Sequence, residues 1–204
     1  MTSSEPRILS RVLASGVCGE LAPISSQPRP RLICLIGFMG TGKSTVARLL
    51  SRQIGWKHVD LDKRVTETAG MEITAIFARQ GEPAFRRMET EELRRVLGEA
   101  VESSAPTVVS LGGGTTTQPA NLELLRACGA SLVWLHCPVE ELLSRISRIT
   151  NRPLFRDESS FRLLYEQRLP SYELADYRVE SNVEPLRVVE QILNLGILEK
   201  VQAS

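Results

Sequence analysis

The sequence contains little histidine and no paired cysteines. It has two histidines, and its four cysteines form no C-x-x-C pair. Zinc sites, histidine-centred triads and disulfide frameworks need these residues in number or at set spacings, so their scarcity argues against all three. We expect cysteines such as Cys34 and Cys137 to be small buried apolar residues in a reducing compartment, which favours a cytoplasmic protein.

Charge of one sign and long apolar runs are also missing. The 25 basic and 24 acidic residues leave a net charge of +1, so no excess of charge points to nucleic acid or to a membrane surface. No apolar run approaches the ~20 residues of a membrane span. The apolar fraction of 42% is enough for a sizeable core, and 204 residues are typical of one domain.

The strongest signal is a phosphate-binding loop. A short apolar run, Leu32–Ile36, predicts a buried strand; the pattern G-x-x-x-x-G-K-S follows from Gly37 to Ser44, and helical spacing follows that. Glycines let the backbone turn its N–H groups toward a phosphate, and the helix N-terminus adds a positive dipole end. Lys43 can reach the outer phosphates, and the Ser44 hydroxyl can ligate magnesium. The alternative is a glycine-rich turn that matches by chance.

A second short strand, Trp56–Asp60, is predicted to end in Asp60-Leu61-Asp62. Two acids one residue apart in extended chain point the same way, at the sheet edge where open α/β proteins bind ligands. Beside a phosphate loop, the pair suggests a magnesium ligand and an acid that contacts substrate. The alternative is a helix N-cap, because Asp62 precedes a helical pattern.

Two further helices are expected after this strand. Residues 73–77 suggest a short helix, 80–82 a turn, and a longer helix runs from Pro83 to about Val101 with a clear apolar stripe. Near its start, Arg86 and Glu89 share one face. Spacing alone favours a solvated charged face for this pair.

A buried strand at Thr107–Leu111 leads into the triplet Gly112–Gly114. Three glycines at the carboxyl end of a core strand permit close approach of a ligand to the backbone, although a simple tight turn would also use them. A helix over 119–128, a strand over 131–136 and a helix over 139–149 continue the alternation.

Residues 147–160 are polar and have the composition of a mobile lid. We expect an amphipathic helix after it that Pro170 interrupts, then a strand at Tyr177–Glu180 and a terminal helix over 186–195. About five strands thus alternate with helices, which predicts a P-loop three-layer α/β sandwich: a central five-stranded parallel sheet with helices on both faces. Residues 1–30 are expected to be a flexible extension, with an organellar targeting segment as the alternative.

Taken together, the motifs resemble shikimate kinase. The similarity runs from about Arg31 to Leu198, so residues 31–200 are expected to form one kinase domain. The pieces that carry it are Gly37–Ser44, Asp60-Leu-Asp62, Gly81–Arg87 with Glu89, Leu111–Gly114, Asn151–Leu154 and Arg168–Tyr172. The phosphate loop is common to many kinases, whereas the other pieces together are diagnostic.

The resemblance implies ATP- and Mg²⁺-dependent phosphorylation of the 3-hydroxyl of shikimate, a step of chorismate and aromatic amino-acid synthesis. It also implies a monomer, as in most small members of the family. It implies three catalytic residues: Lys43, Asp62 and Arg152. It implies a nucleotide site made of Gly40, Thr41, Gly42, Lys43, Ser44, Thr45, Arg145 and Arg152. It implies substrate contacts from Asp62, Arg86, Gly112, Gly113, Gly114 and Arg168, and magnesium ligands Ser44 and Asp60.

These implied roles agree with the chemistry of phosphoryl transfer, which needs alignment and positive charge more than covalent catalysis. The resemblance makes Arg86 and Arg168 a clamp for the shikimate carboxylate, with Glu89 holding Arg86, and a guanidinium fork suits a planar carboxylate better than lysine does. Asp62 is either a general base or an acceptor that orients the hydroxyl. Closure of the lid, with Arg152, would exclude water.

Two alternatives stay open at this stage. One is another small-metabolite kinase of the same fold, such as a gluconate-type kinase, which would lack the arginine pair with the glycine triplet. The other is a shikimate-kinase-like protein that binds without catalysis, although the residues needed for catalysis are present.

Overall fold

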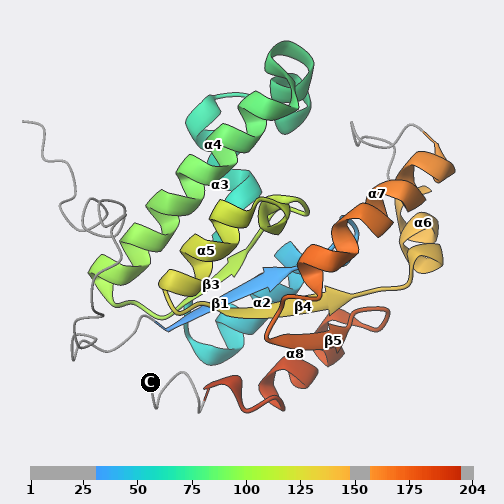
Figure 1. The fold of residues 1–204 in the computed structure, drawn as a ribbon. Helices are drawn as coiled ribbons and strands as arrows, with labels where there is room; N and C mark the ends of the chain where they lie inside the picture. The colour runs from blue at the N-terminus through green and yellow to red at the C-terminus, as the bar shows by residue number, and fades with distance from the viewer. Residues whose placement is uncertain (1–30, 148–156, 199–204) are drawn as a thin grey trace, which may run out of the picture.

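The chain forms an α/β sandwich around one parallel sheet (Figure 1). The computed structural model describes residues 31–147 and 157–198. The strands are β1 (Leu32–Ile36), β2 (Lys57–Asp60), β3 (Thr107–Ser110), β4 (Ser131–His136) and β5 (Tyr177–Glu180). Their order is β2-β3-β1-β4-β5, and every pairing is parallel. The predicted five-stranded sheet is confirmed, with the strand of the phosphate loop at its centre.

The burial of β1 on both faces shows why the sheet is covered by a layer of helices on each side. All five of its residues are buried, so a continuous apolar run was needed there. Because side chains alternate along a strand, Leu32, Cys34 and Ile36 pack into one core. Ile33 and Leu35 pack into a second core on the other face of the sheet. The sheet therefore separates two apolar layers, as the prediction of helices on both faces requires.

The helices divide between these layers (Figure 1). Helices α2 and α8 pack on one face, while α4, α5, α6 and α7 contribute buried residues to the other. The bounds are α2 (Lys43–Ile54), α3 (Leu61–Ala69), α4 (Ile73–Ser103), α5 (Pro119–Ala127), α6 (Val139–Ser147), α7 (Glu158–Tyr172) and α8 (Pro185–Leu193), with a 3-10 turn η1 at Thr115–Thr117.

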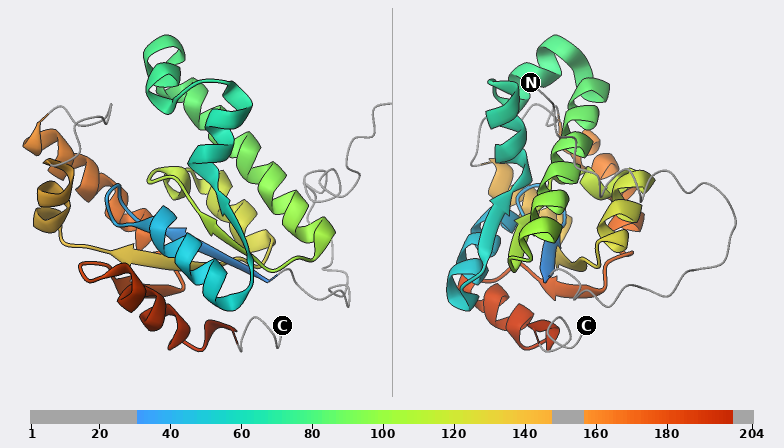
Figure 2. Two further views of the ribbon diagram at one scale, coloured as in Figure 1. Left: turned by 180° about the vertical axis from the view of Figure 1, so that it is seen from behind. Right: turned by 90° about the vertical axis from the view of Figure 1, so that its left-hand side faces the viewer.

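Helix α4 contains the turn that the sequence predicted within it. Gly81 has φ 77° and ψ 169°, a conformation that breaks the helix into two arms and that glycine adopts without strain. Pro83 then stands near the start of the second arm, where its missing N–H costs little. The first arm packs with α3 in a small separate core of Val65, Ile76 and Phe85. The lobe formed by α3 and the first arm of α4 lies beyond the edge of the sheet (Figure 2).

One prediction about α7 is wrong. Pro170 was expected to interrupt the helix, but α7 continues through it to Tyr172. A proline within the last turn removes a single backbone hydrogen bond, and the helix ends two residues later. As a result Arg168 and Tyr172 lie one turn apart on the same helix, both buried.

The carboxyl ends of β1, β2 and β3 lie at one edge of the sheet, because the strands are parallel and in register. The phosphate loop, Asp60 and the glycine triplet follow these three ends directly. The predicted extension 1–30 and most of the predicted lid, including Arg152, lie outside the described residues. Within the described ranges, no helix is long and apolar enough to cross a membrane.

Candidate active site

The phosphate loop has the shape that its sequence predicted. Gly40 and Gly42 have φ values of 85° and 87°, which side-chain-bearing residues rarely adopt. A Cβ on Gly37 would lie 2.6 Å from the carbonyl oxygen of Leu135, so only glycine fits beside β4. Helix α2 begins at Lys43 without a side-chain cap. Its first N–H groups are therefore directed out of the helix end toward the loop, where they favour an anion.

Lys43 and Thr41 hold the loop together from inside. The Lys43 Nζ donates to the carbonyl oxygens of Gly37 and Phe38, both at 2.8 Å. The Thr41 hydroxyl is buried and donates to Phe38 O at 2.9 Å, so this side chain shapes the loop. Ser44 and Thr45 are exposed at the start of α2. Arg145, from α6, donates to Gly40 O at 3.4 Å, which brings a guanidinium against the loop.

The two aspartates do not share one direction, which corrects the prediction for the Asp60–Asp62 pair. Asp60 ends β2, but Leu61 already begins α3, so the chain is not extended between the two acids. Asp60 accepts from Ser110 Oγ at 2.9 Å and caps α3 through Lys63 N at 3.2 Å. The N-cap alternative was proposed for Asp62, but the capping residue is Asp60, and Asp62 lies in the first turn of α3. Asp60 and Ser44 line one cavity, while Asp62 lines another.

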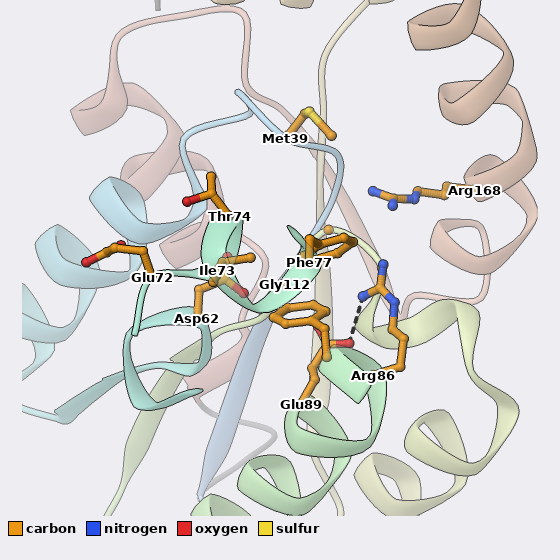
Figure 3. Close-up of a pocket in the computed structure, with 13 residues that line it drawn as sticks. Met39, Asp62, Glu72, Ile73, Thr74, Phe77, Arg86, Glu89, Gly112 and Arg168 are labelled. Carbon is orange, nitrogen blue, oxygen red and sulfur yellow. Dashed lines mark hydrogen bonds and ion pairs between the residues drawn. The ribbon is translucent and has the colours of Figure 1, made fainter. Parts of the chain in front are cut away.

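The cavity that Asp62 lines has a volume of about 300 Å³ and lies between the lobe and the sheet edge (Figure 3). Its walls come from the phosphate loop, α3, both arms of α4, the glycine triplet and α7. The lining residues are Met39, Asp62, Glu72, Ile73, Thr74, Phe77, Phe85, Arg86, Glu89, Gly112, Gly113, Gly114 and Arg168. Every substrate residue implied by the resemblance is among them.

Arg86 is fixed by two carboxylates of different character. Its Nη1 donates to Glu89 Oε2 at 2.8 Å, and Glu89 is fully buried. Its Nε and Nη2 donate to Glu82 Oε1 at 3.1 and 2.9 Å, and the Glu82 side chain is 51% exposed. Burial lowers the pKa of Arg86, but the charges and hydrogen bonds of Glu89 and Glu82 outweigh it and raise the pKa overall. The pair that spacing assigned to a solvated face is therefore part of the cavity wall.

Arg168 reaches the same cavity from α7 and lies on the same side of it as Arg86 (Figure 3). Its residue is only 5% exposed, and its guanidinium carbon lies 5.4 Å from the centroid of the Phe38 ring. Burial lowers its pKa; hydrogen bonding and charge from Tyr172 oppose that shift, and the charge of Arg86 adds to it. Among the described side chains no carboxylate forms an ion pair with Arg168, and its guanidinium lines the cavity beside Gly113.

The glycine triplet leaves room for the side chains of the site. A Cβ on Gly112 would lie 2.4 Å from Glu89 Oε1 and 2.8 Å from Asp62 Oδ1. A Cβ on Gly114 would meet the Arg86 guanidinium, and one on Gly113 would lie 3.2 Å from Arg168 Nη1. None of the three has a positive φ. Their need for glycine is thus one of space, and the acids and arginines of the site occupy that space.

Comparison with known proteins identifies the family. The family model described as shikimate kinase matches residues 39–195. The chain belongs to the shikimate kinase family. A shikimate kinase of Geobacter metallireducens is 41% identical over 161 residues, covering 78% of this chain and 87% of that protein. One of Chlorobium chlorochromatii is 40% identical over 169 residues, covering 78% and 86%.

Solved structures of shikimate kinases agree with the fold. The shikimate kinase from Acinetobacter baumannii in complex with shikimate superposes with a TM-score of 0.76 at 34% identity, covering 85% of this chain and 96% of that one. The Aquifex aeolicus enzyme gives 0.70 at 35% identity, covering 82% and 95%. A gluconokinase from Sinorhizobium meliloti gives 0.56 at 18% identity, covering 87% and 97%, and this likeness shows the fold alone.

Residue patterns did not reveal every member of this shikimate kinase site. Phe38, Thr115 and Tyr172 all touch implied site residues, and none was singled out for a role. Tyr172 stood in the R-x-P-x-Y motif, which was a usable signal. Phe38 and Thr115 act through contacts across the fold, for which a single sequence offers no signal.

Proposed function

We propose that this protein transfers the γ-phosphoryl group of ATP to the 3-hydroxyl of shikimate, forming shikimate 3-phosphate for chorismate and aromatic amino-acid synthesis. Members of the shikimate kinase family use ATP for this reaction. The observation that carries the proposal is the cavity in which the partly buried Arg86 and the buried Arg168 meet Asp62 beside the phosphate loop. Two guanidinium groups in one small cavity suit a planar carboxylate, and the acid suits hydroxyl groups.

In the proposed complex, the shikimate carboxylate binds Arg86 and Arg168, and the backbone of Gly112–Gly114 lines the ring. Arg168 contributes a buried positive charge that has no carboxylate partner within residues 31–147 and 157–198, which favours an anionic ligand in this part of the cavity. Met39 joins the cavity to the phosphate loop, so a bound acceptor would lie next to the nucleotide. This adjacency supports direct transfer from ATP to the substrate hydroxyl.

For the nucleotide half, we assign the phosphates to Gly40–Thr45 and charge stabilisation to Lys43. Lys43 bonds two loop carbonyls, which hold its ammonium over the concave side of the loop. Arg145 is assigned to the adenine side because it lies against Gly40. Arg152 is assigned to lid closure within 147–160 on the resemblance alone, and the kinase domain is taken to span 31–200.

A magnesium site at Ser44 and Asp60 fits the residues present. Both line one cavity, and hydrogen bonds from Ser110 Oγ and Lys63 N hold the Asp60 carboxylate in place. Magnesium needs only one or two protein oxygens, since water and phosphate oxygens complete its octahedron. When bound there, Mg²⁺ would neutralise charge on the transferring phosphates.

The chain's own residues then align the transfer. The acceptor hydroxyl oxygen attacks the γ-phosphorus, the bond to the β-γ bridging oxygen breaks, and ADP leaves. Asp62 either takes the hydroxyl proton as a general base, or accepts a hydrogen bond that orients the attacking oxygen while the proton passes to an oxygen of the transferred phosphoryl group. We further propose that the protein works as a monomer in the cytoplasm. Measurement of its molecular mass in solution tests the first point, and cell fractionation tests the second.

The direct test is identification of the product. The protein is incubated with ATP, Mg²⁺ and shikimate, and the products are examined by ³¹P NMR and mass spectrometry. We expect ADP and one phosphate monoester coupled to the C3 proton of the ring. ADP with inorganic phosphate and unchanged shikimate would contradict the proposal and favour a different acceptor.

A further inference from the structure

Thr115 does not line the substrate cavity, but it contacts Glu89, which does. It is the first residue of η1, immediately after the glycine triplet, and it is fully buried. Its hydroxyl donates to Glu89 Oε1 at 2.6 Å. The bond joins the turn after β3 to the second arm of α4, which are 26 residues apart in the sequence.

Glu89 divides its two oxygens between two donors. Oε1 accepts from Thr115, and Oε2 accepts from Arg86 Nη1 at 2.8 Å. A fully buried carboxylate is costly unless donors satisfy its oxygens, so each of these bonds helps to hold the Glu89 side chain in one orientation. Since Arg86 takes its position from Glu89, the hydroxyl of Thr115 acts on the guanidinium through one intermediate.

Thr115 is itself held from behind. Asn121, which is fully buried in α5, donates its Nδ2 to the Thr115 carbonyl oxygen at 3.0 Å. The Thr115 N–H donates to Gly112 O at 3.2 Å. These bonds fix the backbone from which the hydroxyl projects. The glycine triplet, the hydroxyl and the carboxylate are therefore one connected unit.

The neighbouring threonines do not share this position. Thr116 is also buried, but its hydroxyl lies 3.5 Å from Ser171 Oγ on α7. The Thr117 hydroxyl donates to Gly114 O at 2.7 Å within the turn. Of the three residues of η1, Thr115 is the one whose hydroxyl bonds Glu89.

We propose that Thr115 is a positioning residue for substrate binding, which through Glu89 sets Arg86 in register with the backbone of the glycine triplet. The inference rests on the proposed function, because it assigns the substrate carboxylate to Arg86. Thr115 controls how well the clamp is formed before substrate arrives. Its loss therefore weakens substrate binding more than it slows the chemical step.

The test compares Thr115→Val, which keeps the shape but removes the hydroxyl, with Thr115→Ser, which restores it. A lost hydrogen bond to a buried charge is expected to raise the KM for shikimate about tenfold or more in Thr115→Val. The kcat, the KM for ATP and the values for Thr115→Ser should stay within about threefold of wild type. Thr116→Val, a buried threonine whose hydroxyl does not reach Glu89, is the matched control.

A double-mutant comparison separates positioning through Glu89 from a general loss of stability. In the Glu89→Gln background, Thr115→Val should add little further loss. Thr115→Ala provides a second hydroxyl-free variant if the valine form unfolds.

The outcomes distinguish the two levels of the proposal. Wild-type protein that releases no ADP with shikimate overturns the proposed function. Active wild type with an unchanged shikimate KM in folded Thr115→Val, an equal effect in Thr116→Val, or no rescue by Thr115→Ser overturns the role of Thr115 alone.

Discussion

The guanidinium of Arg168 lies over the ring of Phe38, with 5.4 Å between the guanidinium carbon and the ring centroid. Phe38 belongs to the phosphate loop, and Arg168 belongs to α7. Phe161 and Tyr165, on the same helix, pack edge-on against the same ring at 5.0 and 5.3 Å. One side chain of the phosphate loop thus supports the helix that supplies half of the proposed carboxylate clamp.

Phe38→Leu should therefore weaken shikimate binding. Leucine keeps an apolar group in the core but removes the ring face under Arg168, a contact of about 0.5–2 kcal/mol. We expect the KM for shikimate to rise by about twofold to thirtyfold, with a smaller change in the KM for ATP. Steady-state kinetics with each substrate varied in turn measures both. A change confined to ATP would show that Phe38 serves the nucleotide alone.

Arg86→Ala should remove most shikimate affinity and leave nucleotide binding largely intact. Truncation of one partner of a buried charge pair costs about 2–5 kcal/mol, and here it also leaves Glu89 buried with one donor fewer. Titration calorimetry with shikimate and, separately, with ATP gives the two affinities. An equal loss of ATP affinity would contradict the assignment of Arg86 to the acceptor.

The two glutamates that hold Arg86 should behave differently. Glu82 is half exposed, and ion pairs of that kind contribute about 0–1 kcal/mol. We expect Glu82→Gln to change the Kd for shikimate by less than about fivefold, and Glu89→Gln to raise it about tenfold or more. The two positions lie seven residues apart, about two helical turns, and carry the same chemical change, so each variant controls for the other. Equal effects would mean that burial of Glu89 is irrelevant to binding.

Asp62→Asn should lower turnover while the fold is preserved. A positioned acid that accepts a proton contributes about 10²- to 10⁴-fold to rate, so the kcat should fall by at least about a hundredfold if Asp62 is a general base. A smaller decrease would favour the orienting role. Circular dichroism and thermal melting check the fold. Full activity would remove Asp62 from the mechanism.

The sequence-based prediction succeeded where the signal was local. The predicted ranges of all five strands agree with the observed strands to within one residue, and the loop from Gly37 to Ser44 identified the start of α2. It failed where two principles competed. Pro170 predicted a break, but it lies in the last turn of α7, where the helix continues through it and ends at Tyr172. Asp60 and Asp62 were expected to point the same way along an extended chain. Because α3 begins at Leu61, between the two acids, this alternation of side chains does not apply to them.

The candidate site was predictable in composition but not in arrangement. The motifs identified Arg86, Glu89 and Arg168, whereas their contacts depend on segments far apart in the chain. The partner of Glu89 is Thr115, and that of Arg168 is Phe38, 130 positions away. A single sequence carries no record of such pairs. The sequence explained the glycine triplet only by the approach of a ligand to the backbone. The structure adds a second reason, because the side chains of Glu89, Asp62 and Arg86 occupy the space that a Cβ at Gly112 or Gly114 would take.

Stability should depend on pH through Glu99, which bonds Arg64 and Lys57. Partial burial raises the pKa of Glu99, but the hydrogen bonds and charges of Arg64 and Lys57 outweigh it, so the pKa lies below the usual 4.5. A carboxyl with a lowered pKa in the folded state adds stability above its unfolded pKa, and this stability is lost as pH falls through the folded pKa.

Glu99→Gln should therefore destabilise the protein near neutral pH, by less than about 1 kcal/mol because the pair is largely exposed. The difference between variant and wild type should shrink at a pH below the folded pKa. Urea unfolding of both proteins at about pH 7 and about pH 3.5 measures it. The same difference at both pH values would mean that the charge of Glu99 has no part in its effect.

The central claim is that the cavity selects a carboxylate-bearing cyclic polyol as the phosphoryl acceptor. A coupled ADP-release assay with shikimate, with gluconate and without an acceptor tests it most directly. We predict saturable ADP release with shikimate, and release with gluconate no faster than the background without an acceptor. ADP release that does not depend on shikimate, or that gluconate supports equally well, would contradict the account.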